Sequence, residues 1–159
     1  MKTDTDDLFV KDLHFISKDY FGALSHMMAH TDLDRNYYTL LLICQSDTGL
    51  TQKYLSEFLE VDKVTMSRKI DHLHGCGYVE RRTNPADRRT VIIAPSEKAF
   101  RILDGLKRAF ARAEKEAFRG IDPCERDAFL ATARKVRANI GGMPKSPVKL
   151  EYKQKSSKP

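Results

Sequence analysis

The stretch ERRTNPADRRT, residues 80–90, has two arginine pairs that flank the tetrapeptide NPAD. The runs on either side, YVERRT and RTVIIA, are rich in residues that favour β-strands, and Pro85 can start a type I turn. Residues 78–94 are therefore predicted to form a β-hairpin. Four guanidinium groups in one hairpin repel each other unless an anionic partner offsets the charge. A nucleic-acid phosphate backbone is the partner that this pattern favours.

Two helices are predicted directly before the hairpin. The first begins near Thr51, and its predicted inner face consists of Tyr54, Leu55, Phe58 and Leu59. A tight turn at residues 60–62 separates it from the second, which covers roughly residues 63–74. Asp62 can cap the second helix through its carboxylate, and Gly75 and Gly77 suit a left-handed C-terminal cap. Helix, turn, helix and hairpin together predict a helix-turn-helix followed by a wing.

The second of these helices has one apolar and one polar face. At about 100° per residue, Met66, Ile70 and Leu73 cluster on one side. The opposite face is small and hydroxylated and carries an arginine, which suits entry into a DNA major groove. The candidate groove residues are Lys63, Val64, Thr65, Ser67, Arg68 and His72. We expect Asp71 to pair with a cation such as Arg68 or to lie beyond the DNA.

The hairpin is the second candidate contact, because an arginine at the tip of a β-turn can reach into a narrow, electronegative minor groove. The candidate wing residues are Arg81, Arg82, Asp87, Arg88 and Arg89. In this interpretation the Asp87 carboxylate orients the neighbouring guanidinium groups.

The segment TQKYLSEFLEVDKVTMSRKIDHLHGCGYVERRTNPADRRTVIIAPSEKA, residues 51–99, closely resembles the core of the MarR family of bacterial winged-helix transcription regulators. The resemblance implies that Arg88 and Arg89 are minor-groove contacts buttressed by Asp87, and that Thr65, Ser67 and Arg68 are major-groove contacts. Glu60 departs from the family pattern, in which a glycine is common in the turn. The layout of predicted helices fits the family from about residue 8 to residue 140.

The flanking regions carry long apolar stripes. Residues 9–27, 96–117 and 123–140 each repeat apolar side chains at helical spacing, and residues 35–47 are apolar almost all round. Paired with a second copy, such stripes would bury their surface, and a homodimer would offer two recognition helices to a pseudo-palindromic operator. The expected fold is mainly α with a small β-hairpin wing. Its expected parts are an N-terminal dimerisation helix (1–34), a winged helix-turn-helix (35–95), C-terminal dimerisation helices (96–140) and a basic flexible tail (141–159).

The composition of the chain indicates its class of protein and its expected location. The chain has 159 residues, 41% of them hydrophobic and 31% charged, which is typical of one globular domain, and no apolar run is long enough to span a membrane. The net charge of +6 comes largely from the tail, which has five lysines and one glutamate. The acidic, polar N-terminus is unlike a secretory signal, so a cytoplasmic location is expected. Three cysteines without a CxxC pair indicate neither a disulfide framework nor a zinc knuckle, and no cofactor is expected.

Several functions remain to be weighed. The leading hypothesis is a homodimeric, sequence-specific regulator, a repressor relieved by a small aromatic or anionic effector; by the resemblance, Tyr37 and Tyr38 could line its pocket. The alternatives are a nonspecific architectural DNA-binding protein and a winged helix used for protein association. His26 and His30 have a spacing that can bind a metal, and Cys76 could sense oxidants. Histidines and cysteines in such positions are more often structural. No enzyme motif is present.

Overall fold

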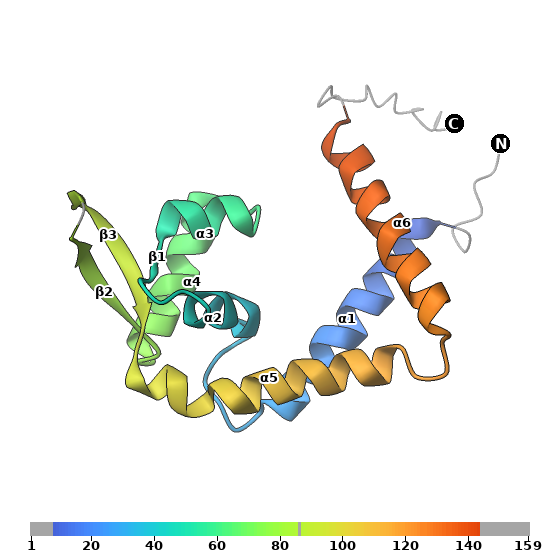
Figure 1. The fold of residues 1–159 in the computed structure, drawn as a ribbon, viewed down its shortest axis with the longest axis horizontal. Helices are drawn as coiled ribbons and strands as arrows, with labels where there is room; N and C mark the ends of the chain where they lie inside the picture. Colours follow the sequence, from blue (N-terminus) through green and yellow to red (C-terminus); the bar gives the residue numbers. More distant parts are fainter. Residues whose placement is uncertain (1–7, 86, 144–159) are drawn as a thin grey trace, which may run out of the picture. The chain divides into compact units, whose positions relative to one another are not determined.

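The computed structural model describes residues 8–85 and 87–143. Residues 144–159, most of the predicted basic tail, lie outside the described residues. The chain divides into two compact units, one up to Ala117 and one from Phe118 onward, whose helices and strands are labelled in Figure 1. The helices of the first unit are α1 (Phe9–Met27), α2 (Tyr37–Cys44), α3 (Gln52–Phe58), α4 (Lys63–Gly75) and α5 (Glu97–Ala117). Its strands are β1 (Leu50–Thr51), β2 (Val79–Asn84) and β3 (Asp87–Pro95), and the second unit contains α6 (Pro123–Gly141).

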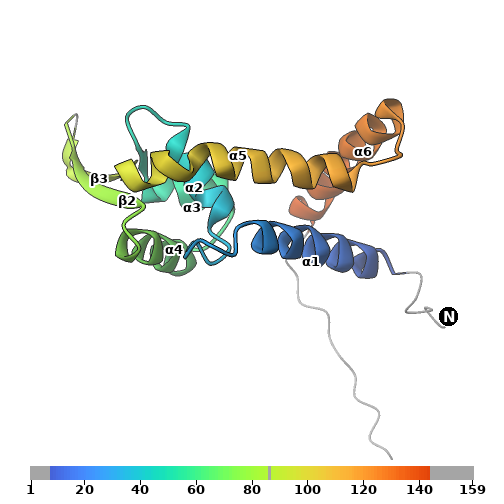
Figure 2. The ribbon, with the colours of Figure 1, turned by 90° about the horizontal axis from the view of Figure 1, so that it is seen from below.

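The predicted hairpin is present, as β2 and β3, and a third strand completes the sheet. The order is β1-β3-β2 and both pairings are antiparallel, with Ile93 of β3 opposite Arg81 of β2 and Leu50 of β1. The sequence did not predict β1, because a two-residue strand is too short to show alternation. The hairpin and α4 lie at the end of α5 where that helix begins (Figure 2).

The core of the first unit joins every helix of that unit to the sheet. Its fully buried side chains include Leu24 of α1, Leu40 and Ile43 of α2, Leu55 of α3, Met66, Ile70 and Leu73 of α4, Val79 and Ile93 of the sheet, and Leu106 of α5. Each such side chain contributes roughly 1.5–3 kcal/mol of transfer free energy. The predicted apolar side of α4 is therefore confirmed, and it fixes which face of this helix is left outward.

Local capping follows the predictions closely. The Asp62 carboxylate accepts hydrogen bonds from the backbone N–H groups of Val64 and Thr65, both at 2.9 Å. Gly77 has the expected left-handed conformation with φ +75°, whereas Gly75 is the last residue of α4 and has no such conformation, so that prediction was wrong. Glu60 has φ +52°, in the position where family members commonly have glycine. A left-handed conformation costs a non-glycine residue about 1–2 kcal/mol, which the rest of the fold has to offset at Glu60.

The predicted inner face of α3 is wrong in two of its four positions. Leu55 is buried and Leu59 partly buried, but Tyr54 and Phe58 are 45% and 47% exposed. Their rings stack on each other with centroids 5.8 Å apart. Successive helix residues turn by about 100°, so once Leu55 and Leu59 face the core, their neighbours Tyr54 and Phe58 point to the side.

Apolar side chains on α1 and α6 are exposed to solvent. On α1, large apolar side chains that are about half exposed include Phe9, Val10, Leu13 and Ile16. α6 begins with a capping box at Asp122 and Glu125, yet it has no buried residue; Phe129 and Ile140 are 51% and 55% exposed. Among the described helices, none combines the length and apolar content needed to cross a bilayer.

Candidate nucleic-acid interface

The outward face of α4 begins at its N-terminus. Lys63, Val64 and Arg68 are exposed, and Thr65 and Ser67 are half-buried. The Thr65 hydroxyl donates to the Asp62 carboxylate at 2.6 Å, and this bond is the largest cause that lowers the pKa of Asp62. A protruding apolar side chain, hydroxyl groups and an arginine therefore share one exposed helix surface, which is the chemistry that a major groove accepts.

Asp71 pairs with a cation, in line with one of the two expectations for it, but the cation is Arg81 and not Arg68. Its Oδ1 accepts a hydrogen bond from the Arg81 guanidinium of β2, and its Oδ2 accepts a weaker one from the Ser67 hydroxyl at 3.4 Å. The ion pair joins α4 to the first strand of the wing. The sequence did not indicate this pairing, because the two residues are ten positions apart and belong to different elements.

The four wing arginines fall into two kinds. Arg81 is paired with Asp71, and Arg82 is paired with Glu80 of its own strand at 2.9 Å. Arg88 and Arg89 are exposed at the start of β3, and in residues 8–85 and 87–143 their guanidinium groups, like that of Arg68, have no salt-bridge partner. Ion pairs within the protein thus reduce the mutual repulsion of the arginines at Arg81 and Arg82, and leave it uncompensated at Arg88 and Arg89.

Asp87 stabilises the turn by a different route from the one expected. Its carboxylate accepts hydrogen bonds from the Thr90 hydroxyl at 2.7 Å and from the Arg89 backbone N–H at 3.0 Å. The Thr90 hydroxyl is the main cause that lowers the pKa of Asp87, followed by the Arg89 N–H. The carboxylate therefore holds the backbone that carries the arginines, not their guanidinium groups.

His72 points toward the body of the protein. Its Nε2 lies 2.7 Å from the Asp32 carbonyl oxygen, in the loop between α1 and α2. The imidazole thus packs on the α1–α2 loop, although His72 lies one turn after Arg68 on the same side of α4.

A polar junction surrounds Asp32 on the same side. Lys98 of α5 contacts the Asp32 carboxylate at 3.3 Å, donates to the Cys76 carbonyl at 2.6 Å and lies over the Tyr78 ring. A hydrogen bond from the Tyr78 side chain is the main cause that lowers the pKa of Asp32, and burial followed by Asp32 raises that of Tyr78. The sequence contained no signal for this cluster, since Asp32 and Lys98 are 66 positions apart.

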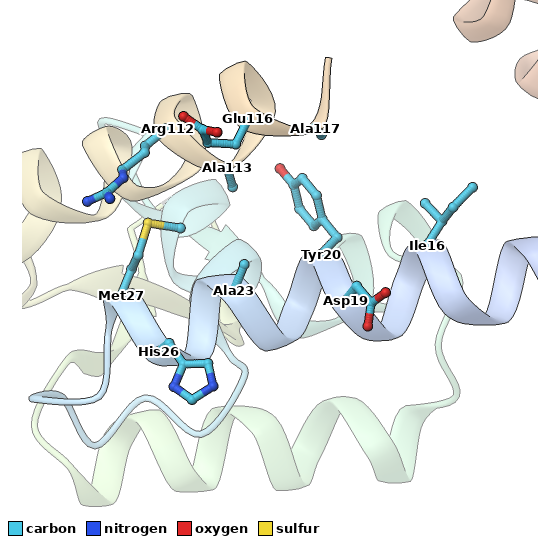
Figure 3. Close-up of a pocket in the computed structure, with 10 residues that line it drawn as sticks. All are labelled: Ile16, Asp19, Tyr20, Ala23, His26, Met27, Arg112, Ala113, Glu116 and Ala117. Carbon is cyan, nitrogen blue, oxygen red and sulfur yellow. The ribbon is translucent and has the colours of Figure 1, made fainter. Parts of the chain in front are cut away.

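The two candidate pocket tyrosines do not share a cavity. Tyr37 is 5% exposed and lines a cavity of about 460 Å³ with the end of α1, the α1–α2 loop and His72. Tyr38 is 47% exposed, and its ring meets that of Phe110 edge to face. A second cavity of about 600 Å³ lies between α1 and α5, where Tyr20 points toward α5 and His26 points away from it (Figure 3).

The described residues show no metal-binding cluster, and two of the three thiols are shielded. In this part of the chain no three His, Cys, Asp or Glu side chains gather closely enough to hold an ion. Burial raises the pKa of Cys44 to about 11, and burial together with Asp32 raises that of Cys76. A raised thiol pKa lowers the fraction of reactive thiolate, which disfavours oxidant sensing at either residue.

Comparison with known proteins agrees with this architecture. Residues 31–90 match the model of the MarR family. The HTH-type transcriptional regulator YybA of Bacillus subtilis, itself uncharacterised, is 27% identical over 109 residues, which cover 69% of this chain and 73% of YybA. A MarR family regulator from Listeria monocytogenes, crystallised with a 26mer DNA, has a TM-score of 0.77 at 21% identity and covers 89% of this chain and 99% of its own. CouR from Rhodococcus jostii RHA1, bound to p-coumaroyl-CoA, has a TM-score of 0.72 at 23% identity. The match covers 94% of this chain and 100% of CouR.

The helix-turn-helix of α3 and α4, followed by the β2–β3 wing, forms a winged helix-turn-helix, a fold that binds DNA in many proteins. Residues 31–90 are thus similar to the MarR family of transcriptional regulators, and the two crystal structures share the fold.

Proposed function

We propose that this protein is a homodimer that binds a specific DNA sequence and represses transcription until a small ligand releases it. In this proposal α4 enters the major groove and the β2–β3 wing reaches the minor groove. The observation that carries the proposal is the distribution of ion pairs: Arg68, Arg88 and Arg89 are exposed with no salt-bridge partner among the described residues, whereas Arg81 and Arg82 are paired. An arginine without an ion-pair partner in the protein gains more binding free energy from a phosphate or a base edge than one that is already paired.

The proposed major-groove set consists of Lys63, Val64, Thr65, Ser67 and Arg68. Val64 is 60% exposed and can contact a thymine methyl group, and Arg68 can bond guanine through two donors. Lys63 stands at the N-terminus of α4, where it can reach a phosphate. We leave His72 out of the set because its Nε2 contacts Asp32.

The proposed dimer uses the apolar surfaces that each unit leaves exposed. The N-terminal part of α1 exposes Phe9, Val10, Leu13 and Ile16, and α6 exposes Phe129 and Ile140. Large apolar side chains exposed on a helix surface commonly mark an association site. We therefore assign residues 1–34 and 96–140 to dimerisation and residues 35–95 to DNA binding. A monomer mass in sedimentation at micromolar concentration would contradict this assignment.

The proposed effector is a small aromatic or anionic molecule. The cavity beside Tyr37 supports it, because the buried tyrosine lines a space of about 460 Å³ that also borders His72 of α4. The volume lies within the usual range for ligand pockets. CouR carries p-coumaroyl-CoA, an aromatic acyl thioester, on the same fold. A ligand here would act on the α1–α2 loop and α4 together. Because such a regulator acts on chromosomal DNA, the proposal also places the protein in the cytoplasm.

The test is fluorescence anisotropy on a duplex from upstream of the protein's own gene, compared with random duplex. Arg68→Ala and Arg88→Ala should each weaken specific binding by about 1–3 kcal/mol. Arg101→Ala is the matched control, because Arg101 lies on α5 and is 72% exposed in an ion pair with Glu97. Equal affinity for both duplexes, with sensitivity to the arginines, would indicate the alternative of a nonspecific architectural DNA-binding protein. Indifference to Arg68 and Arg88 would leave protein association as the use of the fold.

A further inference from the structure

The ion pair between Asp71 and Arg81 connects the two elements that the proposed function places on DNA. Asp71 lies on α4, one turn after Ser67 and Arg68, and Arg81 lies on β2 at the base of the wing. We propose that Asp71 and Arg81 form a brace that holds the wing at a fixed position relative to α4, so that both are positioning residues and not DNA contacts. The inference rests on the proposed function and adds the means by which its two contact surfaces stay in register.

The brace has a firm attachment in the sheet. Arg81 is opposite Ile93, which is 1% exposed and pairs on its other side with Leu50, so Arg81 stands where all three strands are aligned. Beyond it, the β2–β3 register is irregular between Thr83 and Asn84. A restraint at Arg81 therefore acts within the three-stranded part of the sheet, before the turn that carries Arg88.

The brace is also attached firmly to the helix. Asp71 follows Ile70, whose side chain is fully buried, so the backbone at this position is held by the core. The Asp71 carboxylate divides its oxygens between the two sides: Oδ1 accepts from Arg81 and Oδ2 accepts from Ser67. The chain of contacts thus runs from the outward face of α4 through Asp71 to β2.

Charge supports positioning over DNA contact. A carboxylate on a helix that faces DNA repels phosphate unless a cation neutralises it, and Arg81 is that cation. Arg81 is also less exposed than Arg82, with 37% against 57% of its side chain accessible. The guanidinium of Arg81 is already engaged by Asp71, so within the wing Arg88 and Arg89 are the arginines without a salt-bridge partner among the described residues.

A neighbouring ion pair serves as an internal control. Glu80 and Arg82 pair at 2.9 Å, and their side chains are 53% and 57% exposed, comparable to the 59% of Asp71. Both belong to β2, so this pair connects no two elements. Removing either carboxylate, Asp71 or Glu80, takes one negative charge from the same region, but only Asp71 would release the wing.

The experiment measures dissociation constants over a series of salt concentrations, on the duplex that the wild-type protein selects from a random-sequence pool. Electrostatics alone predicts that removing a carboxylate tightens DNA binding. The brace predicts the opposite sign for Asp71→Asn, a weakening of about threefold to tenfold. Glu80→Gln should bind as the wild type does, or more tightly. Equal or tighter binding by Asp71→Asn would overturn the proposal.

Two further readouts separate positioning from contact. Arg81→Gln should weaken binding without changing the salt slope, whereas Arg88→Gln should lower the slope by about one because a phosphate contact is lost. Once Asp71→Asn has released the wing, Arg88→Gln should cost less than it does in the wild type, since the two residues act through one element. A lowered slope for Arg81→Gln, or independent effects of Asp71 and Arg88, would overturn the brace.

The outcome is distinguishable from failure of the proposed function itself. If the wild type selects no preferred sequence, the proposed function fails. If it selects one and Arg88→Gln weakens binding, the function stands, and the sign for Asp71→Asn alone decides the brace. Unfolding curves at equal protein concentration verify that each variant is folded, as expected for a solvent-exposed pair. Arg81→Gln tests the same contact from the other side.

Discussion

Ser96 joins the end of the wing to the start of α5, and its hydroxyl is predicted to stabilise that joint. The side chain is 8% exposed; its Oγ donates to the Gly77 carbonyl at 2.6 Å and accepts from the Ala99 N–H at 3.3 Å. The second bond is that of a helix N-cap. Ser96→Ala removes both hydrogen bonds. Because Gly77 is itself solvent-exposed, water can replace part of the bond to the Gly77 carbonyl. The combined loss is about 1–2 kcal/mol in the free energy of unfolding.

The assay is thermal and urea unfolding of Ser96→Ala, at the same protein concentration as the wild type because association shifts apparent stability. For a chain of this size the loss corresponds to a fall of roughly 4 °C in Tm. Thr48→Ala is the control, since Thr48 is exposed and its hydroxyl has no hydrogen-bond partner among the described residues. If Ser96→Ala is no less stable than Thr48→Ala, the hydroxyl does not secure the joint and the reasoning fails.

Two further predictions concern backbone conformation and thiol chemistry. Gly49→Ala should destabilise the fold more than Gly77→Ala, although both glycines have positive φ: a Cβ at Gly49 would lie 2.8 Å from the Ile93 carbonyl oxygen, whereas at Gly77 the nearest atom is 3.9 Å away. Left-handed strain alone costs about 1–2 kcal/mol, and equal losses in urea unfolding would contradict the close contact. Cys44, with a thiol pKa of about 11, and Cys76, whose pKa is also raised, should react with iodoacetamide more slowly than a cysteine peptide near neutral pH and faster as pH rises. Mass spectrometry of the labelled peptides measures this, and peptide-like rates at both thiols would refute it.

The caps of the helices were predictable because each involves residues close together in the chain. Asp62 reaches N–H groups two and three residues ahead, and Asp122 and Glu125 form a capping box within one turn. The apolar side of α4 was equally predictable, since helical spacing alone places Met66, Ile70 and Leu73 together. Such features depend on local geometry and on little else.

The errors occur where a helix is short or a partner is distant. α3 has only seven residues, so its spacing could not decide between Leu55 and its neighbours Tyr54 and Phe58 as the inward position. The contact of His72 with the Asp32 carbonyl was not expected, because the loop that carries Asp32 cannot be placed against α4 from the sequence. In each case the missing information was which element packs beside the residue.

The arginine pairs of residues 80–90 show where the two kinds of information divide. The sequence by itself determined the helix-turn-helix, the hairpin and the presence of four arginines around its turn, because periodicity, capping and turn residues act over a few positions. Tertiary structure decided which arginines stay unpaired. α4 brings Asp71 to Arg81, while the turn directs the Asp87 carboxylate to its own backbone and leaves Arg88 and Arg89 exposed. Ion pairing falls off with distance in space, and only the packing of α4 against β2 sets that distance.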